Sequence, residues 1–429
     1  MNYCKLGDLC QIEKGKIGIT KAVDGQYPLV TTAESRGSHN EYHFDKPAVI
    51  IPLVSSTGHG HASINRLHYQ EGKFAVGSIL AVLTPKDPEL LNAQYLYTFL
   101  STNKDQLLVS LMRGAANVSL SISKVKEVVI PVPSMDQQLE IVKKFNKLQS
   151  DISAFQAQTE KGSILLRNLR QQILQDAITG KLSEKWREAN SNVESAEALL
   201  EKIKDKKEKL IIKGRIRRQK LSLPVEEKLL FKVPKGWVLC RLGEAVYLTR
   251  GSSPRPISHY VTSSPEGVNW IKIGDTQNIE KYLFKTEQRI TIEGAEKSQR
   301  VEAGDLILSN SMSFGKAYIL KTDGYIHDGW FLIKLLGLID CDYFYYLILS
   351  NFIQEQFRSS ATGGVVQNIR SELVYRTVIP IPPLLEQQHI AQRIEMLFNK
   401  IDRIKELKLE NQNNINLLNQ VVLKEMFEL

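Results

Sequence analysis

Several kinds of chemistry are missing from this sequence of 429 residues. Its cysteines, Cys4, Cys10, Cys240 and Cys341, form no CxxC pair, so the sequence predicts neither a zinc site nor a disulfide framework. No uncharged apolar run reaches the roughly eighteen residues of a membrane span. The N-terminus lacks the apolar stretch of a signal peptide. We therefore expect reduced thiols and a cytoplasmic protein that does not bind a membrane.

Catalytic motifs are missing as well. The chain has no GxxxxGK[ST] loop, no GxGxxG fingerprint and no Asn/Asp-Pro-Pro-aromatic run of the kind that amino-methyltransferases use. His59-Gly60-His61 offers two imidazoles, but no carboxylate or cysteine stands at a matching metal-ligand spacing. Glu226-Glu227-Lys228 lies in a charged stretch rather than in a nuclease-like site. The sequence thus predicts no catalytic residue and no metal site.

The positive charge is unevenly distributed. The net charge is +9, and residues 201–220 hold ten Lys or Arg against three acidic residues, a surplus of seven. The rest of the chain is close to neutral, so the total charge does not by itself indicate nucleic-acid binding. Two interpretations of this basic segment stay open, a solvated linker and a segment that contacts phosphates.

The most informative feature of the sequence is a repeat. VVIPVPSMDQQLEIVKKF begins at Val128, and TVIPIPPLLEQQHIAQRI begins at Thr377. With an offset of 249 residues the two copies align without a gap from Gly114/Gly363 to Ile173/Val422. The prolines cannot continue a helix, and they end a run rich in Val and Ile. Each copy therefore predicts a strand, a proline turn and a helix of about forty residues, roughly 60 Å long.

The two predicted helices share a coiled-coil pattern. Apolar residues recur at alternating steps of four and three, the 3.5-residue period of a seam. The pattern is interrupted at Thr159 and Gly162 in one helix and at the equivalent Lys408 and Asn411 in the other. Matching interruptions favour an antiparallel pair within the chain over two separate core helices. The predicted seam residues are Ile141, Phe145, Leu148, Ile152, Phe155, Leu166, Leu169, Ile173, Ile390, Ile394, Leu397, Ile401, Ile404, Ile415, Leu418 and Val422.

A second echo marks where each half begins. Leu6-Gly7-Asp8 followed by Lys14-Gly15 is similar to Leu242-Gly243-Glu244 followed by Arg250-Gly251, at an offset of 236. Between the echo and the proline turn the halves hardly match, and both indicate short strands and turns. We predict an α+β fold with a pseudo-twofold internal repeat, in which two globular mixed α/β domains are separated by two long helices forming an antiparallel coiled coil. The expected bounds are 1–134 and 233–383 for the globular domains, 135–190 and 384–429 for the long helices, and 191–232 for a basic helical linker.

Loops that combine glycine, small polar residues and a few cations are candidates for DNA contact. Residues 113–124 and 362–373 occupy the same place in the two halves, just before the strand and proline turn. Each candidate is also compatible with an ordinary solvated turn. The candidates are Lys14, Lys16, Thr31, Thr32, Ser55, His59, His61, Arg113, Asn117 and Ser119 in the first half, and Arg250, Ser253, Arg255, Lys272, Asp275, Asn310, Ser311, Lys316, Gly363, Gly364, Gln367, Asn368 and Arg370 in the second.

These features together resemble a known family. The paired IP(V/I)P…QQ turns with long helices, LRQQILQDAITGKLSEKWRE (169–188) and LFKVPKGWVLCRLGE (230–244) are similar to the specificity subunit of Type I restriction–modification systems. The likeness runs along the whole chain in the same order. It implies a non-catalytic DNA-binding subunit whose globular domains are target recognition domains, each reading one half of an asymmetric bipartite target in double-stranded DNA.

The resemblance also implies partners. Two methyltransferase subunits would dock on the helices and bring S-adenosylmethionine, and two restriction or translocase subunits would bring ATP and Mg²⁺, so this chain itself would hold no cofactor. A helix of roughly 60 Å corresponds to at most about 17–18 base pairs between the half-sites. The alternative is a coiled-coil scaffold with two ligand-binding β-rich domains, which would lack salt-sensitive DNA binding.

Overall fold

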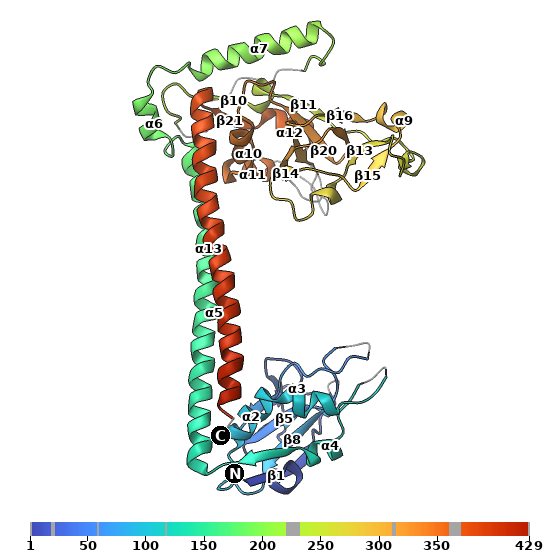
Figure 1. Ribbon diagram of the computed structural model, residues 1–429, viewed down its shortest axis with the longest axis vertical. Helices are drawn as coiled ribbons and strands as arrows, with labels where there is room; N and C mark the ends of the chain where they lie inside the picture. The colour runs from blue at the N-terminus through green and yellow to red at the C-terminus, as the bar shows by residue number, and fades with distance from the viewer. Residues whose placement is uncertain are drawn as a thin grey trace. The chain divides into compact units, whose positions relative to one another are not determined.

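The computed structural model describes residues 2–18, 22–57, 60–115, 118–219, 232–310, 315–359 and 370–427. The chain divides into two compact units, residues 1–160 with 407–429 (unit 1) and residues 161–406 (unit 2). Each unit joins one globular domain to a stretch of both long helices, α5 (Met135–Ile178) and α13 (Leu384–Glu425) (Figure 1). The two helices predicted from the repeat are therefore present, with 44 and 42 residues. No helix among the described residues is long and apolar enough to cross a bilayer.

The domain of unit 1 is built on a four-stranded antiparallel sheet in the order β2-β8-β5-β6. Strand β5 (Ala48–Pro52, AVIIP) is buried along its whole length. Its side chains alternate between two cores, because successive residues of a strand point to opposite faces. Val49 and Ile51 pack with helix α2, and Ala48 and Ile50 pack with the small sheet β4-β3-β7. The other elements are β1 (Asn2–Lys5), α1 (Leu6–Leu9), β2 (Cys10–Lys14), β3 (Tyr27–Val30), β4 (Gly37–His39), β6 (His68–Gln70), β7 (Ala75–Val76), β8 (Leu80–Pro85), α2 (Ala93–Thr102), α3 (Lys104–Leu107), α4 (Ile122–Glu127) and β9 (Val129–Val132).

Unit 2 repeats this plan with more strands. Its five-stranded sheet has the order β11-β20-β17-β18-β14, and β17 (Leu306–Ser309) again divides its side chains between two cores. A second sheet, β12-β15-β13-β19-β16, has five strands, whereas the small sheet β4-β3-β7 among the described residues of unit 1 has three. The elements are β10 (Val238–Arg241), α8 (Leu242–Ala245), β11 (Tyr247–Arg250), β12 (Val261–Thr262), β13 (Val268–Ile271), β14 (Tyr282–Leu283), β15 (Gln288–Ile290), α9 (Ile292–Ala295), β16 (Gln299–Val301), β18 (Ala317–Leu320), β19 (Gly324–Ile326), β20 (Trp330–Lys334), α10 (Cys341–Leu349), α11 (Asn351–Ser359), α12 (Ser371–Arg376) and β21 (Val378–Ile381).

The repeated proline and glutamine residues build the same joint in both units. Gln138 is fully buried; its amide donates to Pro133 O (2.9 Å), and its Oε1 accepts from Asn92 N (2.8 Å). Gln387, also fully buried, repeats both bonds with Pro382 O (2.8 Å) and Asp340 N (2.9 Å). A buried amide needs partners for its donors and its acceptor, and this joint supplies them. The glutamine therefore ties the start of each long helix to the globular domain.

The strands next to this joint also correspond. β1 pairs with β9 in unit 1, and β10 pairs with β21 in unit 2, both antiparallel and in equivalent register. A buried tyrosine hydroxyl fastens each strand, Tyr95 to Pro131 O and Tyr343 to Pro380 O, both at 2.9 Å. The predicted internal repeat is thus present in the backbone, and the α+β fold class is confirmed.

The predicted seam is wrong at three positions. Leu169, Ile404 and Leu418 are 47%, 45% and 61% exposed, while the other thirteen predicted seam residues are buried or half-buried. A straight α-helix drifts by about 20° per heptad against a strict 3.5-residue repeat, so the inward-facing position moves along by one. Arg170 and Asn419 face inward in place of Leu169 and Leu418. Leu169 and Leu418 are 249 residues apart, and so are Arg170 and Asn419, so the same one-residue shift occurs in both long helices.

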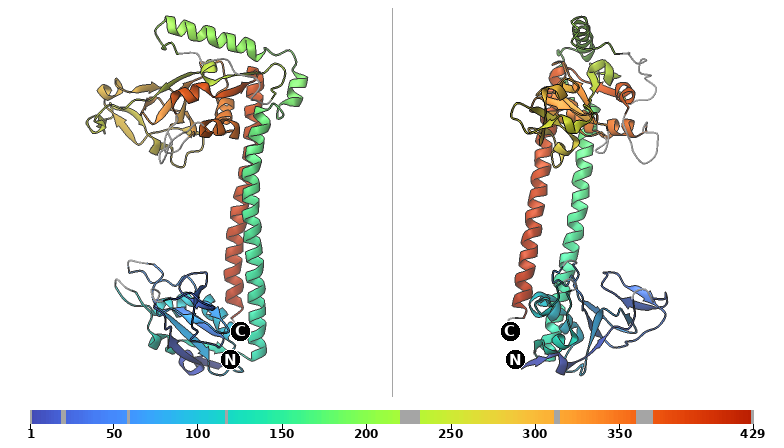
Figure 2. Two further views of the ribbon diagram at one scale, coloured as in Figure 1. Left: turned by 180° about the vertical axis from the view of Figure 1, so that it is seen from behind. Right: turned by 90° about the vertical axis from the view of Figure 1, so that its right-hand side faces the viewer.

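Within each unit the two helix stretches lie side by side and run antiparallel (Figures 1 and 2). In unit 1, Lys408 Nζ donates to Thr159 O at 2.7 Å, so the two predicted interruptions contact each other. In unit 2, Arg170 pairs with Asp402 across the helices. The interruptions at Thr159 and Lys408 and the inward-facing Arg170 therefore have polar partners on the opposite helix.

The basic helical linker predicted over 191–232 contains helix α7 (Ala196–Ile212), which lies across the domain of unit 2 (Figure 2). Its apolar side chains Ala196, Leu199, Leu200 and Ile203 belong to the main core of that unit. Lys207 donates to Gly243 O (2.7 Å) and Glu244 O (3.0 Å), and burial lowers its pKa to about 8. In unit 1 the equivalent carbonyl, Gly7 O, accepts from Lys86 at 2.8 Å. Part of the basic segment therefore completes the unit 2 domain, and its remaining exposed cations keep both interpretations open.

Candidate nucleic-acid interface

Four candidate residues of unit 2 converge on one acidic residue, Asp328, in the turn before β20. Its carboxylate accepts from Ser253 Oγ (2.9 Å) and Arg255 Nη2 (3.0 Å). Its backbone carbonyl accepts from Arg250 Nε (3.1 Å) and Asn310 Nδ2 (2.8 Å). Burial opposes the charge, but the hydrogen bonds from Ser253 and the backbone hold the pKa of Asp328 below its ordinary range. Residues from three separate segments thus share one charged centre.

Ser253, Arg255 and Asp328 of this cluster border an open hollow of about 1050 Å³. Ser253, Arg255 and Lys272 line it together with the aromatic rings of Trp270 and His327. The side chain of Arg255 is 79% exposed, so most of its donors face solvent. Burial lowers the pKa of His327, which favours a neutral ring beside the cations. Cations, aromatic faces and small hydroxyls at one hollow can contact phosphates and base edges.

The turn Ile273–Thr276, named here the reading turn together with Lys272, forms one wall of the hollow. Asp275 supports this turn rather than facing solvent, since it is 8% exposed and accepts from Lys272 N (2.6 Å) and Glu287 N (2.9 Å). His327 Nε2 lies 3.2 Å from Ile273 N and joins the turn to the Asp328 cluster. Lys272 is the member of the turn whose side chain is free to contact a ligand at the hollow.

Other candidates of unit 2 lie apart from the hollow. Asn310 is only 2% exposed. Lys316 is exposed and borders a different cavity beside the long helices, and Arg370 stands exposed at the start of α12. The candidates Ser311, Gly363, Gly364, Gln367 and Asn368, and likewise His59 and Asn117 of the first half, lie outside the described residues.

The candidates of unit 1 form a smaller cluster. Ser55, Arg113 and Ser119 are joined by backbone pairing, since Ser119 bridges to both Val54 and Arg113. Ser55 Oγ donates to His61 O at 2.5 Å, which places His61 beside them. Lys14 and Lys16 lie exposed around the end of β2, and Thr31 and Thr32 follow β3. No contact among the described residues joins these last two pairs to the Ser55 cluster. In the part of the chain that the structure describes, no group of three or more His, Cys, Asp or Glu could hold a metal ion.

The two glycines that end the second echo, Gly15 and Gly251, each begin a candidate loop, and their close contacts explain why glycine is repeated there. A Cβ on Gly251 would lie 2.0 Å from His327 O, and one on Gly15 would lie 2.1 Å from Gly77 O. Gly251 N donates to Trp330 O, and Gly15 N donates to Leu80 O, both at 2.8 Å. The backbone of the candidate loop therefore touches a neighbouring strand in both units, and only glycine leaves room for this contact.

We expect Gly251→Ala to destabilise unit 2 by about 2 kcal/mol, because the methyl group must push a backbone carbonyl aside. Chemical denaturation of the purified chain measures this change. Gly274→Ala is the matched control, since Gly274 lines the same hollow and a Cβ there would meet nothing within 4 Å. Equal stability of the two variants would contradict the proposed close contact.

The sequence analysis missed an arginine–histidine pair in unit 1. Arg36 donates to His68 Nδ1 (3.0 Å), Gln70 Oε1 (3.0 Å) and Tyr69 O (3.2 Å). His68 is 4% exposed, and burial, together with the positive charge of Arg36, lowers its pKa to about 4. His68 begins β6 and gives no sequence signal for this pairing, because Arg36 lies 32 residues earlier in the chain, just before β4.

This pair predicts that unit 1 loses stability in acid. The unfolded imidazole titrates near 6.5, so between pH 6.5 and about 4 the unfolded chain binds a proton that folded His68 does not. Stability conferred by neutral His68 is therefore complete above pH 6.5 and falls by about 3 kcal/mol as the pH approaches 4. The free energy of unfolding, measured by denaturation at several pH values in this range, should depend less on pH in His68→Gln than in the wild type. The control is His61→Gln, at an exposed histidine of the same unit, and it should keep the wild-type pH dependence. An unchanged pH slope in His68→Gln would contradict the assignment.

Comparison with known proteins identifies the family. Residues 1–161 and 234–412 match the Type I restriction modification DNA specificity domain. The chain belongs to this family. It is 25% identical over 427 residues to the Type I restriction enzyme EcoDI specificity subunit of Escherichia coli, covering 99% of this chain and 87% of that one. It is 32% identical over 207 residues to the EcoBI specificity subunit of Escherichia coli, covering 46% and 40% of the two chains.

Solved structures of the family share the fold. A chain from a structure describing complex assembly and conformational transition of the type I R-M system aligns with a TM-score of 0.61 and 15% identity, covering 99% of this chain and 97% of that one. The HsdS subunit from Thermoanaerobacter tengcongensis aligns with a TM-score of 0.50 and 16% identity, covering 99% and 96%. The resemblance found in the sequence is thus confirmed: this chain is a DNA specificity subunit of the Type I restriction–modification family.

Proposed function

We propose that each globular domain reads one half of an asymmetric bipartite target in double-stranded DNA. The observation that carries this proposal is that the two units share the same joint between domain and long helix but differ in their candidate loops. The joints at Gln138 and Gln387 correspond bond for bond, whereas the Asp328 cluster and the Ser55 cluster differ in residues and contacts. Because the joints are the same, each domain is attached to its long helix in the same way. Because the loops differ, the two domains would prefer different bases. The residue-level DNA contacts named from the sequence remain part of this proposal.

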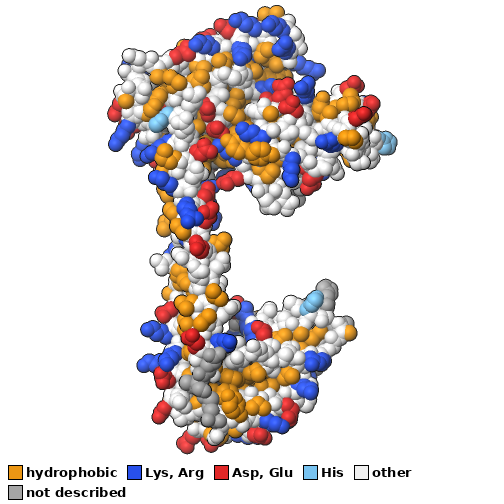
Figure 3. Space-filling model, in the orientation of Figure 1, with side chains coloured by type: hydrophobic (Ala, Val, Ile, Leu, Met, Phe, Trp, Pro, Cys, Tyr) orange, Lys and Arg blue, Asp and Glu red, His pale blue; other side chains and the backbone are white. Residues whose placement is uncertain are grey.

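The two long helices set the distance between the half-sites and dock the methyltransferase subunits. More than half of the large apolar side chains that the described residues expose lie on α5 or α13, for example Leu165 at 67% and Leu417 at 62% (Figure 3). Single exposed apolar residues are ordinary, but their concentration on one structural element is typical of a docking surface. Because α5 and α13 are two copies of one repeat within the chain, two copies of one partner would dock at equivalent places.

The chemistry would reside on these partners. Two methyltransferase subunits would bring S-adenosylmethionine and methylate adenine in each half-site, and two restriction or translocase subunits would bring ATP and Mg²⁺. This chain would supply recognition, spacing and docking, and no cofactor of its own. The absence of catalytic motifs from its sequence supports this division of roles.

Methylation mapping tests the proposal. Adenine methylation is sequenced in cells that carry the methyltransferase subunit, with and without this chain. A split motif of two unlike halves should appear only with the chain, and replacing residues 1–134 with those of a relative should change one half alone. An unchanged methylation pattern, although the complex forms, would refute DNA recognition by these domains.

A further inference from the structure

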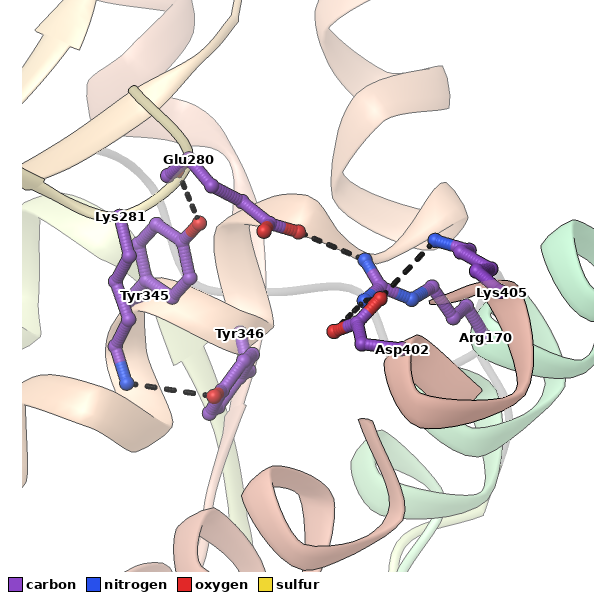
Figure 4. A network of polar contacts seen from close by, with 7 residues as sticks. All are labelled: Arg170, Glu280, Lys281, Tyr345, Tyr346, Asp402 and Lys405. Carbon is purple, nitrogen blue, oxygen red and sulfur yellow. Dashed lines mark hydrogen bonds and ion pairs between the residues drawn. The ribbon is translucent and has the colours of Figure 1, made fainter. Parts of the chain in front are cut away.

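The reading turn is connected to the long helices by one short segment. Residues 278–281, here the tethered loop, follow the turn after Gln277 and lead into β14. Tyr345 of α10 donates its hydroxyl to Glu280 O at 2.7 Å. The Glu280 carboxylate accepts from Arg170 of α5 at 2.7 Å (Figure 4). Two helices therefore hold the backbone and the side chain of the same residue.

Arg170 links the tethered loop to both long helices. One guanidinium nitrogen binds Glu280, and another binds the carboxylate of Asp402 on α13 (Figure 4). The guanidinium also lies 4.6 Å over the ring of Phe398. The Arg170 side chain is 17% exposed. Solvent screens a charge in such a place less than it screens a surface pair. The planar guanidinium also fixes direction, because its donors lie in a rigid fork.

Lys281 forms a second link, and its side chain is only 12% exposed. Its ammonium lies 2.8 Å from Asp342 of α10 and 4.0 Å from Glu395 of α13. The rings of Tyr346 and Tyr282 lie 4.7 Å and 4.9 Å from it. Burial opposes the charge, but Asp342 and the tyrosines raise the pKa of Lys281 above its ordinary value. The lysine therefore stays charged and anchored at neutral pH.

Unit 1 is fastened differently. The position equivalent to Arg170 is Asn419, whose Oδ1 is buried without a partner. The end of α13 instead packs Phe427 edge-on against Phe99 (5.2 Å) and beside Tyr95 (6.3 Å). The first domain thus meets the helices through aromatic packing, and the second through buried cations. This difference makes the first half-site an internal control for the second.

We propose that Arg170 and Lys281 are positioning residues that, through the tethered loop, fix the reading turn on α5, α10 and α13 and thereby sharpen base discrimination in the second half-site. The proposal rests on the proposed function. Only Gln277 separates the turn from the loop, so a displacement of Glu280 or Lys281 moves the backbone that carries Lys272 and Gly274. A base contact discriminates only when its donors are held in place, and a mismatch typically costs ~1–3 kcal/mol.

The test uses the full chain assembled with its methyltransferase subunits, after the wild-type split motif has been mapped. Methylation is measured on duplexes that carry one mismatch in either half-site. Glu280→Gln is the mild variant, because that side chain is 74% exposed and only its ion pair is removed. Lys281→Met removes the second link, and Lys281→Arg retains its charge. Lys321→Met is the control, since the Lys321 ammonium lies 4.6 Å over Tyr282 but outside the cavity that the tethered loop borders.

We expect Glu280→Gln and Lys281→Met to raise methylation of second-half mismatches about fivefold relative to the matched duplex, with first-half mismatches unchanged. Lys281→Arg should restore much of the discrimination. Hydrogen exchange of residues 272–276 should accelerate in the same two variants and not in Lys321→Met, a readout that needs no DNA. Unaltered exchange and discrimination in Glu280→Gln would overturn the proposal even if Lys281→Met fails to fold. A wild-type chain that directs no split motif would instead refute the proposed function, and the exchange data would still decide the tether.

Discussion

Replacing Arg187 with methionine is expected to lower the free energy of unfolding of unit 2 by about 3–5 kcal/mol. The reason is Glu386, which is fully buried at the start of α13. Its carboxylate accepts from Arg187 (2.7 Å), Ser183 (2.7 Å) and Trp237 Nε1 (2.8 Å). Removal of the arginine leaves a buried carboxylate with two neutral donors and no compensating charge, which costs far more than the loss of a surface pair.

Denaturant titration of the purified chain measures the effect. Arg376→Met is the matched control, because Arg376 pairs with Glu372 at 2.7 Å while both side chains are more than half exposed. Such a pair contributes about 0–1 kcal/mol. Adding Glu386→Gln to Arg187→Met should restore part of the stability, since the uncompensated charge is then gone. A single variant as stable as the control would show that Glu386 is not held by this arginine.

The Glu386 cluster explains the structural role of two motifs that, in the sequence, indicated only the resemblance to the family. Ser183 and Arg187 come from TGKLSEKWRE, and Trp237 comes from VPKGW. Between them they bring helix α6 (Glu184–Ala189), the segment before β10 and the start of α13 to one carboxylate. The first repeat has Gln137 in the place of Glu386, and its Oε1 accepts from Ser134 N and Oγ instead. Neither role could be inferred from spacing, because the partners are about 150–200 residues apart.

The sequence predicted the repeat, both long helices and the fold class because each leaves a periodic or duplicated signal. It misplaced Leu169, Ile404 and Leu418 for a physical reason. A strict heptad pattern assumes that the helices supercoil continuously. In these helices the inward-facing position shifts by one residue, so that Arg170 points inward and reaches Asp402 and Glu280. The sequence alone gives no sign that Arg170 faces inward, because its partner Glu280 comes from the globular domain.

The candidate interface was predicted in part. Ser253, Arg255 and Lys272 do line one hollow, although they were chosen from separate segments. Asp328, which organises them, was not chosen, because its partners Arg250 and Ser253 lie 78 and 75 residues away in the sequence. Lys316, another candidate of the same half, borders the other cavity instead. The topology of β17, β18 and β20 decides this placement, and no local pattern encodes it.

Reversing the charge of both Arg250 and Arg255 to glutamate is expected to weaken binding of the second half-site about 100-fold at low salt. Both side chains lie at the Asp328 cluster, and Arg255 is 79% exposed beside the hollow. Two added carboxylates would repel phosphates and also Asp328 itself, so both attraction and loop geometry suffer. Binding of the assembled complex to duplexes bearing the full target or only the first half-site measures the change.

Neutral variants separate the two causes. Arg250→Gln with Arg255→Gln removes charge without repulsion, and if both arginines contact phosphates the slope of log K against log salt should fall by nearly two. Lys285→Glu with Lys321→Glu is the control, because both lysines are exposed in the same unit but lie outside the hollow. A salt slope that is unchanged in the neutral pair, together with normal half-site preference, would show that these arginines only support Asp328. A lost base preference with an unchanged slope would assign them to base edges rather than phosphates.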